Sequence, residues 1–359
     1  MLIRALALGS LVMLATASAK AQPLSAYVSM QNQVVVWDNG IIRTADYLPP
    51  TDYKIGRTAV PFLDNTRSFK IYYGGGVRVI NNGFTNDFKA TDNLVAYTNA
   101  KSLNVFDRGA TKNLTPLCNQ YLYGDSVILF LDGIRNEYKA YYNGTVYPVE
   151  NFLADDAITN AKVSDNIAAY VNYANQFRIF YHGELLRQED YTVQSFGVGR
   201  NTVAYVDANR RFRVFMNGKT QTLDEYAPLD YQVGDNLVAF TTNDGYFKVY
   251  YGDSIRTIGF FRPEYQVGDN IVGYRDAGGY FRVFYRGDLY TLDNYYPGNY
   301  TVQYNSVAYV NRANTLRMFS DGEVYDVTSG SDAWVLNYDV LRYSLGTGVF
   351  RIYYKGQEY

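Results

Sequence analysis

Few residues of this chain have side chains suited to catalysis. One histidine, His182, and one cysteine, Cys118, occur among 359 residues. A Ser-His-Asp triad could form only around His182, which lies in a Tyr-His-Gly turn, and a zinc site made of His and Cys is nearly excluded. We interpret His182 as an exposed turn residue and Cys118 as a small buried hydrophobic residue, because free Cys usually packs as one.

Paired carboxylates remain as a catalytic option, because glycosidases need only two acidic side chains. Asp155-Asp156 and Glu189-Asp190 lie in predicted connecting loops, where adjacent acids are usually just solvated. The sequence therefore favours a non-catalytic protein over a glycoside hydrolase or lyase. It predicts no catalytic residues and no cofactor.

A second set of acids recurs in short turns, each directly before an Asn or Ser: Asp92, Asp125, Asp165, Asp235 and Asp269. A calcium loop gathers several oxygen ligands within one loop, whereas each of these turns offers one acid and one amide or hydroxyl. We expect these acids to hydrogen-bond within their own turns, as Asp and Asn commonly do. No metal site is predicted. The stretch 243–246, Asn-Asp-Gly-Tyr, is interpreted as a hairpin turn.

Basic residues recur in a similar way at the second position of a predicted strand: Lys70, Lys139, Arg178, Arg213, Lys248, Arg282, Arg317 and Arg351. They could form a ring of cations that faces an anionic ligand. We favour the alternative in which each aliphatic stem lies along neighbouring aromatic rings and each charged end meets a carboxylate or water.

All these residues belong to one motif that is repeated about ten times from Pro23 to the last residue. We align its copies on Pro23, Thr58, Asn93, Ser126, Asn166, Asn201, Asn236, Asn270, Asn305 and Asp339, which are spaced by 33 to 40 residues. Four positions later every copy has an aromatic residue: Tyr27, Phe62, Tyr97, Phe130, Tyr170, Tyr205, Phe240, Tyr274, Tyr309 or Tyr343. The residue before that ring is small in most copies, with Pro61, Leu129 and Arg342 as exceptions. A repeat of this length indicates a modular fold.

Each copy reads as four short antiparallel strands. In the copy aligned on Asn270 these are residues 265–267, 271–274, 281–285 and 289–292, separated by Gly- and Asp-rich turns. No stretch after the leader has sustained helical periodicity, so we expect almost no helix. The first copy should begin at its second strand, and the last should stop just after its third.

Four-stranded units can bury both faces as the blades of a β-propeller or as a linear solenoid. We predict an all-β propeller of about ten blades, and one ring is favoured over two tandem five-bladed rings because no linker interrupts the period. The 40-residue step from Ser126 to Asn166 is the one irregularity that a boundary could use.

The repeated pattern resembles a known class of bacterial propeller. Residues 269–274 read Asp-Asn-Ile-Val-Gly-Tyr and residues 281–287 read Phe-Arg-Val-Phe-Tyr-Arg-Gly. This pattern is similar to the blades of TolB-type and other WD40-like propellers, and it covers nearly the whole chain after the leader. The Ser-Pro-Asp-Gly turn common in those blades is not present as such. The resemblance implies an exported propeller that serves as a binding or scaffolding platform.

Aromatic residues near prolines mark the predicted connections between blades. In a propeller these connections emerge on one face, and rigid rings there could form a platform for a protein or a glycan, or could cap the ends of the blades. The candidate binding residues are Tyr47, Tyr226, Phe260, Phe261, Arg262, Tyr295 and Tyr296. A protein-binding module is our first expectation and a carbohydrate-binding propeller the alternative.

Charge and the N-terminal residues indicate where the protein works. The formal net charge is −2 and the basic residues are scattered, which argues against nucleic acid as a partner. Residues 1–21 combine Arg4, an apolar run and small residues at a cleavage site, which is typical of a signal peptide. We therefore expect a propeller domain over residues 22–359, periplasmic or secreted, without a membrane span. Its partner would be an envelope or extracellular protein, or a glycan.

Overall fold

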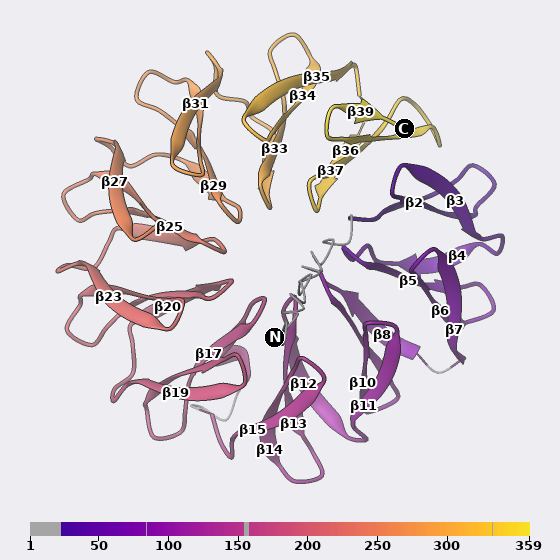
Figure 1. The fold of residues 1–359 in the computed structure, drawn as a ribbon, viewed down its shortest axis with the longest axis horizontal. Helices are drawn as coiled ribbons and strands as arrows, with labels where there is room; N and C mark the ends of the chain where they lie inside the picture. Colours follow the sequence, from indigo (N-terminus) through magenta and orange to yellow (C-terminus); the bar gives the residue numbers. More distant parts are fainter. Residues whose placement is uncertain (1–22, 84, 154–157, 332) are drawn as a thin grey trace, which may run out of the picture.

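The computed structural model describes residues 23–359 except 84, 154–157 and 332. Within this part of the chain the strands form ten separate antiparallel sheets, which we number blades 1 to 10 in chain order. The sheets are arranged around one axis in a single ring (Figure 1). The predicted ten-bladed β-propeller in one ring is confirmed.

Consecutive strands pair in every blade. Blades 1 to 5 comprise β1 (Ser25–Val28), β2 (Val34–Asp38), β3 (Ile41–Asp46); β4 (Pro50–Tyr53), β5 (Ala59–Asp64), β6 (Ser68–Tyr73), β7 (Gly76–Asn82); β8 (Thr85–Ala90), β9 (Leu94–Asn99), β10 (Ser102–Asp107), β11 (Ala110–Thr115); β12 (Cys118–Tyr123), β13 (Val127–Asp132), β14 (Glu137–Tyr142), β15 (Thr145–Glu150); and β16 (Lys162–Val163), β17 (Ile167–Val171), β18 (Phe177–Tyr181), β19 (Glu184–Glu189).

Blades 6 to 10 continue the pattern. They comprise β20 (Ser195–Gly199), β21 (Thr202–Val206), β22 (Phe212–Met216), β23 (Lys219–Asp224); β24 (Asp230–Val233), β25 (Leu237–Thr241), β26 (Phe247–Tyr251), β27 (Ser254–Gly259); β28 (Tyr265–Val267), β29 (Ile271–Arg275), β30 (Phe281–Tyr285), β31 (Asp288–Asp293); β32 (Tyr300–Gln303), β33 (Ser306–Val310), β34 (Thr315–Ser320), β35 (Glu323–Ser329); and β36 (Ala333–Asn337), β37 (Val340–Ser344), β38 (Phe350–Tyr354), β39 (Gln357–Glu358).

The strands of the copy aligned on Asn270 agree with the prediction to within one residue at each end. Blade 1 has three described strands, as expected for a copy that starts at its second strand. The last copy was expected to stop after its third strand, but β39 adds a short fourth strand there. Among the described residues the helical element is one 3₁₀ turn, η2 (Ile158–Asn160).

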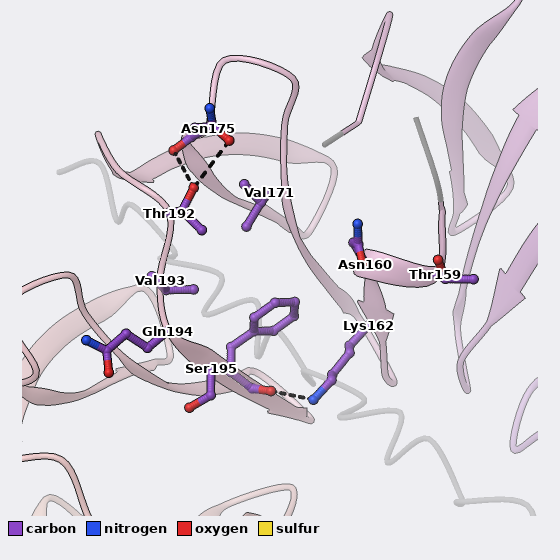
Figure 2. A pocket seen from close by; sticks show the side chains of 10 residues that line it. Thr159, Asn160, Lys162, Val171, Asn175, Thr192, Val193, Gln194 and Ser195 are labelled. Carbon is purple, nitrogen blue, oxygen red and sulfur yellow. Dashed lines mark hydrogen bonds between the residues drawn. The ribbon is translucent and has the colours of Figure 1, made fainter. Parts of the chain in front are cut away.

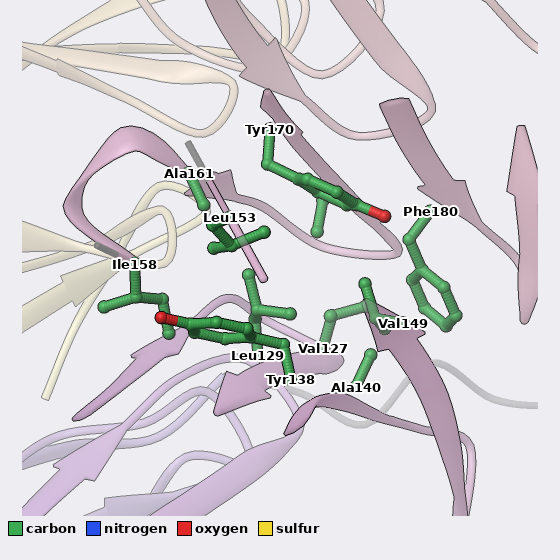
Figure 3. Close-up of a cluster of buried hydrophobic side chains, with 11 residues drawn as sticks. Val127, Leu129, Tyr138, Ala140, Val149, Leu153, Ile158, Ala161, Tyr170 and Phe180 are labelled. Carbon is green, nitrogen blue, oxygen red and sulfur yellow. The ribbon is translucent and has the colours of Figure 1, made fainter. Parts of the chain in front are cut away.

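The aromatic residue of each second strand packs between blades. Nine of the ten rings are buried, and Tyr27 in blade 1 is partly exposed. Phe177 of blade 5 lies 5.2 Å from the ring of Tyr205 in blade 6, and Phe281 of blade 8 lies 5.2 Å from Tyr309 in blade 9. Such rings each bury about 150–250 Å² and prefer tilted or edge contacts. Figure 3 shows one of the resulting clusters, between blades 4 and 5.

Glycine allows the blades to converge at the axis. The turns between first and second strands of neighbouring blades touch there, and a Cβ on Gly199 would lie 1.9 Å from the carbonyl oxygen of Gly234. A Cβ on Gly234 would in turn lie 2.1 Å from the carbonyl oxygen of Gly268. No side chain fits at such distances, so the glycine of the repeated Gly-Asp-Asn turn is required by the neighbouring blade.

The ring closes between blade 10 and blade 1. Arg342 Nη1 donates to the carbonyl oxygen of Ala26 and lies 3.2 Å from the hydroxyl of Tyr53. The ring of Trp37 lies 5.3 Å from that of Tyr354. Most other blades have a small residue at the position of Arg342. In blade 8 the first strand of the next blade lies against this position, and a Cβ on Gly273 would meet Val302 at 2.8 Å. Blade 1 has no described first strand, and this explains the unusual Arg342.

Candidate functional site

The segments that join one blade to the next gather on one face of the ring, together with the turns between second and third strands. The ring of Phe152, in the segment before blade 5, lies 6.0 Å from that of Tyr173 in the turn of that blade. Tyr246 and Phe260 make the same kind of contact at 5.7 Å. We call this surface the connection face. The opposite surface, the turn face, holds the turns between third and fourth strands, which bond to the axial turns, as Arg286 N does to Asn270 O at 3.1 Å.

The predicted binding residues divide into three groups on the connection face. Tyr47, Tyr226 and Phe260 are exposed by 75%, 68% and 82%. Tyr295 is half-buried, and the guanidinium group of Arg312 lies over its ring, 4.0 Å from the ring centre. The exposed rings of Tyr47, Tyr226 and Phe260 are available to a partner.

The other three predicted residues are held by their own blades. Tyr296 packs against the core and donates its hydroxyl to that of Tyr300 at 2.7 Å, so it caps the blade. Arg262 Nε lies 2.6 Å from Asp230 Oδ2. The half-buried Phe261 ring lies against Gly259.

Three further rings on this face were missed in the sequence. Tyr173 and Tyr191 are exposed by 73% and 71%, and Phe152 by 47%. Phe152, Tyr191, Tyr226 and Tyr295 each lie two residues after the last residue of a fourth strand. Alignment of the copies at the ends of their fourth strands would have found Phe152 and Tyr191, whereas the search for a nearby proline did not.

The connection face also contains clefts between neighbouring blades. One of about 440 Å³ separates blades 5 and 6, and its lining includes Asn160, Asn175, Gln194 and Phe196 (Figure 2). Another of about 680 Å³ separates blades 9 and 10 and is lined in part by Trp334. Both volumes are in the range of small-ligand sites.

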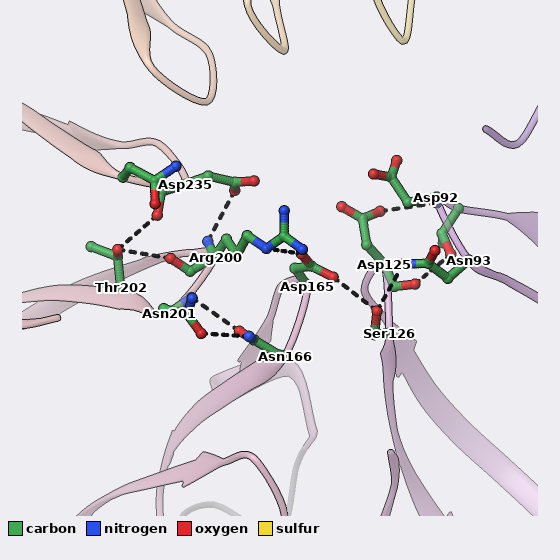
Figure 4. A network of polar contacts seen from close by, with 12 residues as sticks. Asp92, Asn93, Asp125, Ser126, Asp165, Asn166, Arg200, Asn201, Thr202 and Asp235 are labelled. Atoms are coloured by element: carbon green, nitrogen blue, oxygen red, sulfur yellow. Dashed lines mark hydrogen bonds and ion pairs between the residues drawn. The ribbon is translucent and has the colours of Figure 1, made fainter. Parts of the chain in front are cut away.

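The acids of the repeated turns lie around the axis at the turn face. Asp125 Oδ1 accepts from the backbone N–H of Asp92 at 3.3 Å, and Asp235 Oδ1 accepts from that of Arg200 at 2.9 Å. Asp165 Oδ2 lies 2.6 Å from Arg200 Nε (Figure 4). The expectation that these acids bond within their own turns is wrong for Asp125, Asp165 and Asp235, since each bonds to the turn of the preceding blade. These hydrogen bonds connect the axial turns of neighbouring blades.

The crowding at the axis changes the acidity of these groups. Loss of hydration, with the charges of Asp92 and Asp165, raises the pKa of Asp125 to about 8. Loss of hydration likewise raises the pKa of Asp269 to about 8 and that of Asp235 to about 6. The hydroxyl of Tyr304 in blade 9 donates to Asp92 in blade 3, so the axis is bridged by side chains. Among the described residues no group of three or more His, Cys, Asp or Glu side chains is arranged to hold a metal ion.

The repeated basic residues of the third strands are paired, as the favoured interpretation predicted. Seven of the eight form ion pairs within the described chain, the exception being Lys248. Several pairs join blades: Lys70 Nζ lies 2.5 Å from Asp46, and Arg213 Nη1 lies 2.5 Å from Glu189. These cations therefore stabilise single blades, as Lys139 and Arg282 do, as well as contacts between blades.

The possible catalytic groups are also engaged in the fold. His182 is exposed and its Nε2 contacts the amides of Asn166 at 2.8 Å and Asn201 at 3.1 Å. Glu189 accepts from the hydroxyl of Tyr205 at 2.7 Å in addition to its pairing with Arg213, and Asp190 pairs with Arg187 at 2.5 Å. The pair at 155 and 156 lies outside the described residues. Cys118 was expected to be buried but is half-buried, and loss of hydration raises its pKa to about 11.

Comparison with known families agrees with this architecture. A family model described as a 10-bladed beta propeller domain matches residues 18–359. The chain belongs to this family. Comparison of the sequence with curated proteins found no match. The match establishes the ten-bladed propeller, while the closer likeness to TolB-type blades stays a prediction.

Solved structures similar to this ten-bladed propeller are distant. The computationally designed Ika8 protein has 17% identity and a TM-score of 0.36, covering 76% of this chain and 96% of its own. BamB from Moraxella catarrhalis has 14% identity and a TM-score of 0.33, with 73% and 90% covered. Hsv2p from Kluyveromyces lactis has 12% identity and a TM-score of 0.31, with 66% and 93% covered.

The described part of the propeller contains no helix with the length and apolar character needed to cross a bilayer.

Proposed function

We propose that this protein is an exported, non-catalytic propeller that binds protein partners on its connection face. The observation that carries this proposal is the set of exposed rings on that face: Tyr47, Tyr173, Tyr191, Tyr226 and Phe260. Aromatic side chains are enriched where proteins bind each other, since they supply a large contact area at a low entropy cost. The surrounding blades are rigidly packed, so these rings are displayed on a fixed frame.

Two features of the sequence support the cellular context. Residues 1–21 have the pattern of a signal peptide, and the blades resemble those of TolB-type and WD40-like envelope propellers. Export predicts that the mature protein starts near Gln22, which mass spectrometry of the intact purified protein measures. A mature chain that retains Met1 or the apolar run would contradict this part of the proposal.

Site-specific photo-cross-linking tests the binding face. A photoreactive phenylalanine analogue replaces Tyr226 or Phe260 in cells, and matched controls carry it at Glu184 or Asp288, exposed residues of the turn face. We expect discrete protein adducts from the connection face and few or none from the controls. Equal adduct patterns from both faces, or none from the connection face under conditions that capture other envelope complexes, would contradict the proposal.

A further inference from the structure

The two clefts between blades 5 and 6 and between blades 9 and 10 occupy the same place in the repeat. We call them the 5–6 slot and the 9–10 slot. Each lies between the first strands of two neighbouring blades on the connection face. The matching residues of the two slots are Asn160 and Asn299, Lys162 and Thr301, Val171 and Val310, Asn175 and Asn314, and Phe196 and Trp334. Asn175 and Asn314 even share the same backbone conformation, with φ 59° in both turns.

An uncharged residue at the entrance distinguishes these slots from four other blades, whereas blades 4, 6 and 10 are also uncharged at this position, with Gln120, Ser195 and Ala333. Where blades 5 and 9 have Asn160 and Asn299, four others have an acid: Asp52, Asp87, Asp230 and Glu264. Each of those acids has a cation beside it: Lys54 at 3.0 Å, Lys89 at 3.1 Å, Arg262 at 2.6 Å and Arg275 at 3.9 Å. Salt bridges therefore occupy the equivalent place in those blades, whereas the two slots have an uncharged amide side chain there.

The chemistry of the 5–6 slot is that of neutral hydrogen-bonding groups over an apolar floor. Val171 and Val193 are buried, with 7% and 6% exposure. The polar lining consists of the amides Asn160, Asn175 and Gln194 and the hydroxyls Thr159, Thr192 and Ser195. Amides and hydroxyls both donate and accept hydrogen bonds.

The single cation of this slot is already engaged. Lys162 Nζ donates to the carbonyl oxygen of Phe196 at 2.5 Å and lies 5.1 Å from the centre of the Phe196 ring. An anionic ligand would therefore have to compete with an existing bond. The lining instead suits a ligand whose groups, like its own, both donate and accept.

Exposed rings flank the 5–6 slot along the chain. Tyr173 lies two residues before Asn175, and Tyr191 lies directly before Thr192. Both rings are more than two-thirds exposed. The flat face of such a ring can pack against the C–H face of a sugar, and this completes the requirements of a hydroxyl-rich, partly apolar ligand.

The geometry points to the two slots as binding sites for the uncharged sugar residues of a glycan. They are four blades apart in a ring of ten, so one branched or long glycan, or two glycan chains, could engage both and gain affinity from bivalency. The 5–6 slot, with its two exposed tyrosines, is the stronger site. This inference goes beyond the binding of protein partners by other rings of the same face.

Saturation-transfer NMR on the intact mature protein tests the inference. The probes are neutral gluco-, manno-, galacto-, xylo- and N-acetylglucosamine oligosaccharides at millimolar concentration, with uronate and sulfated oligosaccharides and an uncharged peptide for comparison. We expect transfer to at least one neutral oligosaccharide and none, or much less, to the charged sugars and the peptide. No transfer to any neutral oligosaccharide, or stronger transfer to the charged sugars or the peptide, would overturn the inference.

Variants locate the site. Tyr173→Ser and Asn175→Asp should each weaken binding of the neutral oligosaccharide at the 5–6 slot by about tenfold, through loss of ring contact and through an unpaired charge. Tyr226→Ser is the control, since it removes a tyrosine of similar exposure on the same face but away from either slot. Unchanged affinity in both slot variants, with thermal unfolding like that of the parent, would overturn the inference.

Tryptophan fluorescence can report binding at the 9–10 slot. The chain has two tryptophans, of which Trp37 is fully buried in the seam between blades 1 and 10 and Trp334 lines the slot. Binding should shift the tryptophan fluorescence, and Trp334→Phe should abolish that shift. A shift that persists in Trp334→Phe would place the ligand elsewhere and contradict this slot. Since the cross-linking sites at Tyr226 and Phe260 lie outside both slots, failure of one proposal leaves the other measurable.

Discussion

At the scale of single residues, position in the ring decides what a side chain does. The glycines before Asp125, Asp235 and Asp269 lie where the next blade leaves no room for a Cβ. In seven blades the basic residue of the third strand lies where a carboxylate of the same or the preceding blade can reach it, as Arg213 shows with Glu189. Residues of one type at equivalent positions therefore stabilise the scaffold. A residue that departs from the type found in several other blades, such as Asn160, marks a candidate binding site.

Substitution of an axial glycine should be strongly destabilising. Gly199→Ala would place a Cβ 1.9 Å from a backbone carbonyl oxygen that cannot move without shifting blade 7. We expect a loss of about 3 kcal/mol, since overpacking against a rigid neighbour costs that order of free energy. Chemical denaturation measures it. Gly298→Ala is the control, as a Cβ there meets nothing within 4 Å. Equal stability of the two variants would contradict the close approach of the blades.

The axial acids should make stability depend on pH. Because burial raises the pKa of Asp125 to about 8 from its ordinary 3.8, the folded protein holds a proton that the unfolded chain releases above pH 3.8. Folding stability should therefore fall as pH rises from about 4 to about 8. The share of Asp125 in that loss should disappear in Asp125→Asn, whereas the shares of Asp235 and Asp269 remain. Denaturation midpoints over this range measure it. A parent and variant with parallel pH profiles would contradict the account.

Asp64 should give folding stability the opposite dependence on pH in the acid range. Hydrogen bonds from Lys70, Thr66 and Ser68 outweigh burial and lower the pKa of Asp64 to about 2. Its stabilising contribution is present above pH 3.8 and is lost as pH falls toward 2.

At the scale of elements, the blades are uniform in their inner strands and individual in their connections. The second and third strands carry the core, for instance β29 and β30, whereas the segments after the fourth strands vary in length and carry the exposed rings. Such a division places recognition on loops and rigidity on strands, as in many binding proteins.

The seam between blades 10 and 1 is the element-scale contact that can be tested by itself. Arg342→Ala removes the bond to Ala26 O and the contact with Tyr53. We expect faster amide hydrogen exchange in β1 and β37 and unchanged exchange in blade 6, because the remaining blades keep their contacts. Arg187→Ala, which removes an exposed ion pair in blade 5, is the control. Identical exchange at the seam in both variants would contradict the role of Arg342.

The repeat allowed much of this to be predicted. The ten aromatic residues at fixed spacing defined the blades, and the strands around Asn270 were predicted to within a residue, because hairpin patterns are local. The partner of Asp125 lies in the preceding blade and the need for Gly199 arises from the next blade, each some 35 residues away, so a local pattern could not reveal them. Similarly, Tyr226 and Tyr296 look alike in the sequence, and only packing separates an exposed ring from a capping one.

At the scale of the whole molecule, the account depends on closure of ten blades into one ring. Each blade contacts two neighbours, and the seam contributes the same kinds of contact as the other boundaries, with Trp37 packed between Tyr354 and Tyr359. The connection face and its two slots exist only because the ring fixes every blade at one angle to the next.

Removal of blade 10 tests that closure most directly. In the variant that lacks Ser331–Tyr359, the surfaces of blades 1 and 9 lose their partners at once, and nine blades must leave a gap or reclose with strain. We predict that the full-length protein unfolds in one cooperative transition and that the deletion variant has lost this transition. A deletion variant that still unfolds cooperatively, with stability reduced only in proportion to the missing tenth, would show a linear array and contradict the ring.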